Sequence, residues 1–136
     1  MARFLDTNIL LRHLTRDDAA KAEQALALLQ RVERGEERVE TSLLVVFETV
    51  FTLLRFYRVP KQQVRELLAP LLELRGFILP NKGLCVDALD LFVGTNISFA
   101  DAFNAVYMKA RGLTEIYSWD TDFDGLEDIT RVEPQA

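Results

Sequence analysis

Near its start the chain reads Phe4-Leu5-Asp6-Thr7-Asn8-Ile9-Leu10-Leu11. Apolar residues that lead into a carboxylate predict a short strand over residues 3–6, with Asp6 at its carboxyl end. The apolar run that follows Thr7 and Asn8 predicts a short helix over residues 8–14. Taken alone, Asp6 has an ordinary interpretation, because an aspartate placed after a strand often caps the next helix.

The rest of the chain continues this alternation of strands and helices. Further strands are predicted over residues 37–41, 77–79, 115–119 and, more weakly, 129–132. Helices are predicted over residues 17–34, 43–57, 61–75 (kinked or split at Pro70), 83–93 and 99–111. The pattern predicts an α/β fold, with one domain over residues 1–136 and a central, mostly parallel, four- or five-stranded sheet flanked by helices on both faces.

Two carboxylates follow strands of this predicted sheet. Asp6 ends the first strand, and Asp120 comes directly after the fourth. The carboxyl ends of parallel strands form the edge at which ligands bind in open α/β sheets. We therefore expect Asp6 and Asp120 to share one edge of the sheet.

Two more acidic residues occur in helices. Glu48 is the only charge in the apolar run from Leu43 to Leu54, which predicts a helix buried nearly all round. A buried carboxylate without a partner costs several kcal/mol or takes up a proton, and a salt bridge to Arg55 is the structural alternative. Asp101 stands three residues after Ser98, in a helix-capping pattern that requires no chemistry.

Together these four carboxylates favour a metal site. Converging carboxylates repel one another at low dielectric, so that they need cations to stay ionised. A ligand set of oxygen atoms, without a histidine or cysteine cluster, favours Mg²⁺ or Mn²⁺ over zinc. Such a site lowers the pKa of bound water and clamps the attacking and leaving oxygens of a phosphodiester. The predicted chemistry is phosphodiester hydrolysis.

The ordered set of motifs resembles the PIN-domain nucleases, and within them the VapC-type ribonuclease toxins of type II toxin–antitoxin pairs. The resemblance spans essentially the whole chain. It is carried by Phe4-Leu5-Asp6-Thr7-Asn8, by Glu48 in its apolar helix, by Ser98-Phe99-Ala100-Asp101-Ala102 and by Ser118-Trp119-Asp120-Thr121-Asp122-Phe123.

This resemblance implies roles for individual residues. The catalytic and metal-binding acids would be Asp6, Glu48, Asp101 and Asp120. Asp122 stays open as a residue that shares or replaces the role of Asp120, because strand alternation would point both side chains the same way if the strand continues. Asn8 and Ser118 would support the site by hydrogen bonding.

The activity implied by the resemblance is Mg²⁺- or Mn²⁺-dependent endonucleolytic cleavage of RNA. The implied partners are an RNA substrate, a cognate antitoxin protein and a second copy of the chain in a homodimer. The alternative is a non-catalytic PIN-like module that binds RNA or protein as a scaffold.

Bulk composition is compatible with either function. The chain of 136 residues, 49% hydrophobic and 27% charged, is typical of one globular domain. Its net charge of −5 disfavours a surface that coats nucleic acid generally, but not an enzyme that acts on RNA. The single cysteine, Cys85, is expected in the core and fits a reducing compartment. With no signal pattern and no apolar run long enough for a bilayer, we expect a cytoplasmic protein.

Overall fold

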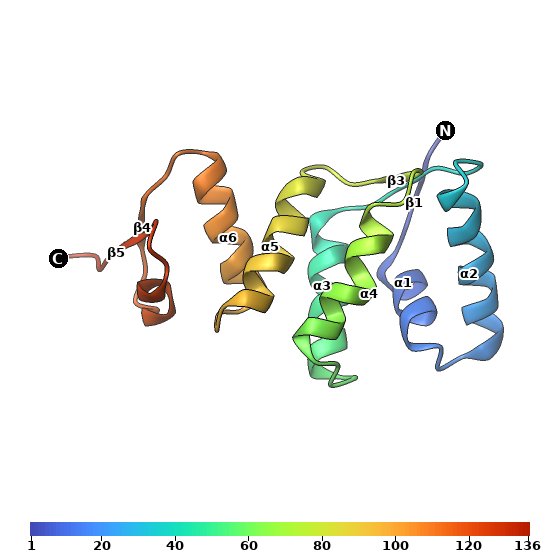
Figure 1. Cartoon of the computed structure of the whole chain (residues 1–136), viewed down its shortest axis with the longest axis horizontal. Helices are drawn as coiled ribbons and strands as arrows, with labels where there is room; N and C mark the ends of the chain where they lie inside the picture. The colour runs from blue at the N-terminus through green and yellow to red at the C-terminus, as the bar shows by residue number, and fades with distance from the viewer. The chain divides into compact units, whose positions relative to one another are not determined.

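The computed structural model describes all residues from 1 to 136 and contains two compact units, Met1–Lys82 and Gly83–Ala136 (Figure 1). The strands are β1 (Arg3–Phe4), β2 (Val39–Glu40), β3 (Phe77–Ile78), β4 (Glu115–Tyr117) and β5 (Thr130–Val132). The α-helices are α1 (Thr7–Thr15), α2 (Ala19–Glu33), α3 (Leu43–Arg55), α4 (Lys61–Leu72), α5 (Lys82–Gly94) and α6 (Phe99–Ala110). A 3₁₀-helix, η1, spans Thr121–Gly125.

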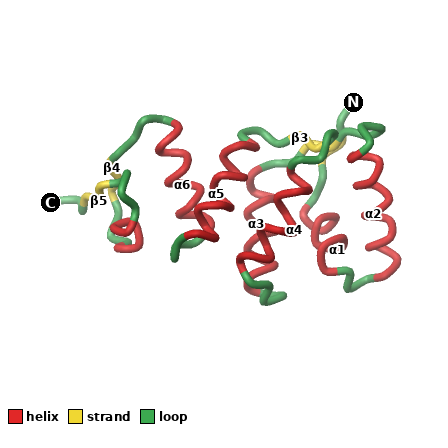
Figure 2. Tube along the Cα trace, in the orientation of Figure 1, coloured by secondary structure: helices red, strands yellow, loops and turns green.

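The first unit is built on a parallel sheet of three short strands in the order β1-β2-β3. Helices α1 and α2 connect β1 to β2, and α3 and α4 connect β2 to β3, as parallel neighbours require. Figure 2 shows how short the strands are beside the helices. Two hydrogen bonds extend the β1–β2 pairing past the strand ends: Leu5 N–H donates to the Glu40 carbonyl, and the buried Thr41 hydroxyl donates to the Leu5 carbonyl, each at 2.8 Å. The backbone just before Asp6 is therefore fixed.

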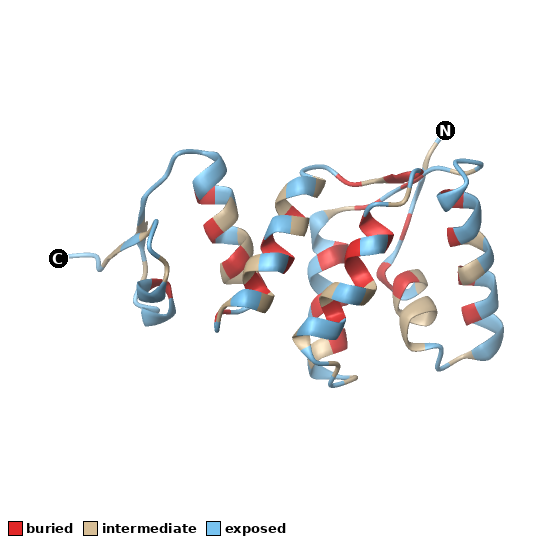
Figure 3. Ribbon diagram, viewed as in Figure 1, coloured by how far each residue is buried: buried red, intermediate tan, exposed pale blue.

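Burial of one side of each helix forms the core of the first unit. In Figure 3, α2 carries its buried positions on one side and exposed positions on the other. The largest side chains with almost no exposure in this unit are Leu5, Leu10, Leu53, Leu68, Leu72 and Phe77. Burying a side chain of this size contributes about 1.5–3 kcal/mol, so that these residues supply much of the driving force for folding.

The prediction that the helix carrying Glu48 is buried nearly all round is wrong. Helix α3 buries one side, formed by Val45, Val46, Thr49, Val50 and Leu53. Its opposite side, including Leu44, Phe47 and Glu48, is exposed. Within the first unit α3 packs against α1 and α4, which together cover only part of its circumference. The apolar sequence of α3 is therefore not sufficient to bury every side of the helix.

Helix starts follow the capping residues of the sequence. Asp18 accepts a hydrogen bond from Lys21 N–H at the start of α2, and Ser42 accepts one from Val45 N–H at the start of α3. Helix α4 continues through Pro70 without a break and ends at Leu72, so that the predicted split is not seen.

The second unit combines α5 and α6 with a two-stranded parallel sheet. Strands β4 and β5 pair in register, with Ile116 opposite Arg131, and η1 lies between them in the sequence. Phe123 anchors η1 in the interior, and Cys85 is fully buried on α5, as expected.

The α/β class predicted from the sequence is confirmed, and every strand pairing is parallel. The five strands are divided between a three-stranded and a two-stranded sheet, one in each unit. A single central sheet, and a single domain over residues 1–136, stay predictions. No helix has both the length and the apolar character needed to cross a bilayer.

Candidate metal centre

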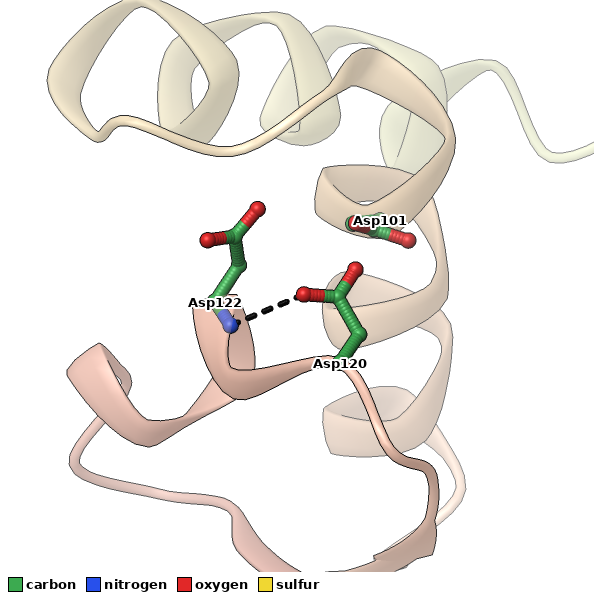
Figure 4. Close-up of side chains that lie close together, drawn as sticks. All are labelled: Asp101, Asp120 and Asp122. Atoms are coloured by element: carbon green, nitrogen blue, oxygen red, sulfur yellow. Dashed lines mark hydrogen bonds between the residues drawn. The ribbon is translucent and has the colours of Figure 1, made fainter.

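Three aspartates of the second unit converge. Asp101 lies in the first turn of α6, Asp120 is the N-cap residue of η1, and Asp122 lies in its first turn. One carboxylate oxygen from each lies within 4.8 Å of the others. Figure 4 shows the three side chains close together. Asp101 is half-buried, whereas Asp120 and Asp122 are exposed. Three oxygen donors at this spacing suit a hard divalent cation such as Mg²⁺ or Mn²⁺.

Local hydrogen bonds shape the segment from Ser118 to Asp124, which we call the acidic turn. The Ser118 hydroxyl oxygen accepts a hydrogen bond from Asp120 N–H at 2.9 Å. Asp120 Oδ1 accepts one from Asp122 N–H, also at 2.9 Å (Figure 4). These bonds are those of a turn rather than a strand, and they fix the backbone at Asp120 and the direction of the Asp120 carboxylate.

A helical turn, and not the alternation of side chains along a strand, brings Asp120 and Asp122 together. Strand β4 ends at Tyr117, and the 3₁₀-helix begins at Thr121, so the strand does not continue through the two aspartates. Both carboxylates nevertheless lie beside Asp101, because the helical turn places Asp122 back over Asp120.

Asp101 takes part in both of the arrangements that its sequence suggests. Its backbone N–H donates to the Ser98 hydroxyl oxygen at 3.1 Å, which is the predicted N-cap of α6. Its carboxylate belongs to the acidic cluster. Burial, followed by the charges of Asp120 and Asp122 and a hydrogen bond with Asp120, raises the pKa of Asp101, while a hydrogen bond with Ser98 acts in the opposite direction. Helix capping therefore does not exclude a role in metal binding.

Asp6 lies in the first unit, at the N-cap position of α1. Its backbone is extended there, but its side chain makes no capping hydrogen bond. The ordinary interpretation of this residue, a carboxylate used for helix capping, is therefore not realised. Asn8 lies exposed in the first turn of α1, and its supporting role stays a prediction.

Glu48 lies in the same unit, exposed on α3. The alternative of a salt bridge to Arg55 is not realised, and the Arg55 guanidinium instead lies over the Phe51 ring, 5.8 Å from its centroid. Neither Asp6 nor Glu48 is thus explained by a structural contact. Their participation in one site with the aspartates of the second unit stays a prediction.

Two features of the second unit differ from the sequence reasoning. Trp119, which follows β4 by two residues, is 72% exposed rather than packed in the core. Arg131 was not singled out, yet it forms an ion pair with Asp124 and donates to the Ser118 carbonyl. The available signal was a lone arginine in the strand that follows a run of three aspartates.

Comparison with known families assigns the chain to a class. The family model described as "PIN domain" matches residues 3–129, a range that includes parts of both units. The chain therefore belongs to the PIN-domain family, which confirms the resemblance found in the sequence.

Among solved structures, two distant neighbours cover almost the whole chain. One is VapC20 of Mycobacterium tuberculosis, described as a sarcin–ricin loop cleaving toxin, with 23% identity over 98% of this chain and 100% of that one and a TM-score of 0.40. The other is VapBC2 of Rickettsia felis, bound to a DNA fragment from its promoter, with 15% identity over 98% of each chain and a TM-score of 0.38. No curated protein sequence matches the chain significantly.

Proposed function

We propose that this protein is a Mg²⁺- or Mn²⁺-dependent endoribonuclease and the toxin of a toxin–antitoxin pair. The observation that carries the proposal is the convergence of Asp101, Asp120 and Asp122, with carboxylate oxygens within 4.8 Å, in a chain of the PIN-domain family. Clustered carboxylates of one sign are costly unless a cation compensates them. The ordered motifs of the sequence support the narrower assignment to VapC-type toxins.

The proposed catalytic residues are Asp6, Glu48, Asp101 and Asp120. Asp101 and Asp120 would hold the metal together with Asp122, and Asp6 and Glu48 would complete the acidic set. When bound, a divalent ion supplies an activated water and neutralises charge on the phosphate. Asp120 ranks before Asp122 because it is the residue whose amide the Ser118 side chain holds.

Ser98 and Ser118 have the same proposed task, one in each of the two segments that supply the cluster. Each hydroxyl oxygen accepts a hydrogen bond from the backbone N–H of an aspartate, Asp101 in the first case and Asp120 in the second. Fixing the backbone in this way limits the directions that the two carboxylates can take. Groups that orient the ligands of a metal contribute to its affinity although they do not touch it.

The proposed partners are RNA, a cognate antitoxin and a second copy of this chain. The exposed apolar side chains Leu44, Phe47 and Phe51 on α3 support a protein–protein contact. Contiguous exposed apolar surface of this kind is typical of interaction sites.

The test is cleavage of RNA by the purified protein with Mn²⁺ or Mg²⁺, compared with chelator. Asp6→Asn and Asp101→Asn should abolish cleavage, whereas Asp128→Asn, which removes an exposed charge outside the acidic turn, should not. Cleavage that survives both chelation and the two active-site substitutions would refute the proposal. Binding of RNA without cleavage under all conditions would favour the alternative, a non-catalytic binding module.

A further inference from the structure

We propose that Arg131 is a positioning residue that holds the acidic turn in the conformation that binds the metal. The inference rests on the proposed function, because it concerns the same site. Arg131 lies on β5, and its side chain is 15% exposed. No role was assigned to it by the motifs of the sequence.

The guanidinium of Arg131 makes hydrogen bonds through all three nitrogens. Nε and Nη2 donate to the two carboxylate oxygens of Asp124, at 2.9 and 3.3 Å. Nη1 donates to the Ser118 carbonyl at 3.1 Å and to Glu133 Oε2 at 2.7 Å. One side chain thus joins the beginning of the acidic turn to its end.

The two anchor points enclose the proposed metal ligands. Ser118 precedes Asp120 by two residues, and Asp124 follows Asp122 by two residues. Ser118 is also the residue whose hydroxyl holds the Asp120 amide. A shift of Ser118 would therefore move the first ligand directly, and a shift of Asp124 would change the turn that carries the second.

We call the hydrogen bonds from Arg131 to Ser118 and Asp124 the arginine clamp. The positive charge of Arg131 gives this clamp a second effect. The acidic turn contains three aspartates, which repel one another when no cation is bound. The positively charged Arg131 side chain pairs with the Asp124 carboxylate through two hydrogen bonds. It makes no hydrogen bond to Asp120 or Asp122, so that it compensates one charge of the turn without occupying the carboxylates that would bind the metal.

The geometry requires arginine rather than a positive charge alone. A carboxylate accepts two parallel hydrogen bonds from the planar fork of a guanidinium, while the remaining nitrogen reaches a second acceptor. The compact ammonium of lysine cannot span Asp124 and Ser118 in this way. Arg131→Lys therefore keeps the charge and removes the clamp.

The experiment measures Mn²⁺ affinity by calorimetry, together with kcat and KM for RNA cleavage. The variants are Arg131→Lys and Asp124→Ala, the second of which leaves the arginine in place. Arg34→Lys is a matched control, because Arg34 forms an equivalent two-point ion pair with Glu36, at 2.9 and 3.2 Å, in the first unit. Both test variants should weaken Mn²⁺ binding by about 10-fold or more, as orienting residues around metal sites do. The KM for RNA should not change, and the control should behave as wild type.

Several results would overturn the inference. Mn²⁺ affinity in Arg131→Lys equal to that of the wild type would do so. A higher KM for RNA with unchanged Mn²⁺ affinity would instead make Arg131 an RNA contact. If Arg131→Lys does not fold, Asp124→Ala alone decides, and wild-type Mn²⁺ affinity in that variant refutes the clamp. A wild type that neither binds Mn²⁺ nor cleaves RNA refutes the proposed function and the clamp together.

Discussion

Replacing Asp101 with asparagine removes one charge from the acidic cluster and leaves the shape of the side chain almost unchanged. Two unit charges 4.8 Å apart repel by about 0.9 kcal/mol at the dielectric of water and about 3.5 kcal/mol at an effective value near 20. Because Asp120 and Asp122 are exposed, the lower figure applies more closely to each pair. Asp101 is repelled by both of these carboxylates, so that its charge destabilises the metal-free protein by about 1–2 kcal/mol.

An opposing effect reduces this gain. Asp101 lies in the first turn of α6, where a carboxylate interacts favourably with the helix dipole by about 0.3–1 kcal/mol. The net stabilisation by Asp101→Asn is therefore about 1 kcal/mol, or roughly 3–4 °C in the melting temperature of a chain of this size. The raised pKa of Asp101 agrees with this direction, because it means that the folded protein disfavours the charged carboxylate.

The assay is thermal unfolding in chelator and in Mn²⁺, with Asp128→Asn as the control. In chelator Asp101→Asn should melt above the wild type. With Mn²⁺ at about 100 times its Kd the wild type should gain about 2.7 kcal/mol, whereas the variant, which lacks one charged ligand, should gain much less. The order of the two melting temperatures should therefore reverse when Mn²⁺ is added.

The pH dependence provides a further check in chelator. Since the pKa of Asp101 is raised in the fold from 3.8, the folded state binds more protons than the unfolded state between that value and the raised one. The contribution of Asp101 to stability thus falls as pH rises through this window. The advantage of the variant should be largest above the window and should vanish below pH 3.8. A variant that melts below the wild type in chelator at neutral pH, or gains equally from Mn²⁺, would refute the reasoning.

Three other substitutions or treatments test separate features. Ser98→Ala removes the N-cap of α6 and should cost about 1 kcal/mol in urea unfolding; it should also weaken Mn²⁺ binding, because the hydroxyl holds the Asp101 amide. Gly76→Ala places a Cβ 2.2 Å from the Glu37 carbonyl oxygen and should cost about 1–3 kcal/mol or more in the same assay, so a neutral effect would contradict the geometry. Burial raises the pKa of Cys85 to about 11, so the native thiol should resist alkylation until the protein unfolds; rapid labelling of native protein would contradict this.

The sequence predicted those parts of the fold that local interactions determine. Helix starts at Asp18, Ser42 and Ser98 follow from side chains that bond to amides three residues away. The sequence locates the strands but predicts them too long, as in β1, which spans Arg3–Phe4 rather than residues 3–6. The end of a strand depends on its hydrogen-bonded neighbour, and local sequence does not contain that information.

The features that the sequence did not predict depend on contacts between distant residues. Burial of α3 is decided by the helices that pack on it, so the exposure of Glu48 did not follow from an apolar pattern. The proximity of Asp120 and Asp122 depends on a 3₁₀ turn that the sequence pattern did not predict. Arg131 reaches Ser118 across 13 positions of sequence, a pairing for which no local motif exists.

The unused capping position at the start of α1 has a consequence for protein engineering. A side chain that caps a helix contributes about 1 kcal/mol, and Asp6 occupies the position without making the bond. Selection for thermal stability alone would therefore favour a substitution such as Asp6→Ser, whose side chain can accept a hydrogen bond from the amides of the first helical turn. If Asp6 acts as proposed, the more stable variants would be inactive, so that a gain in thermal stability at this one residue would cost the activity.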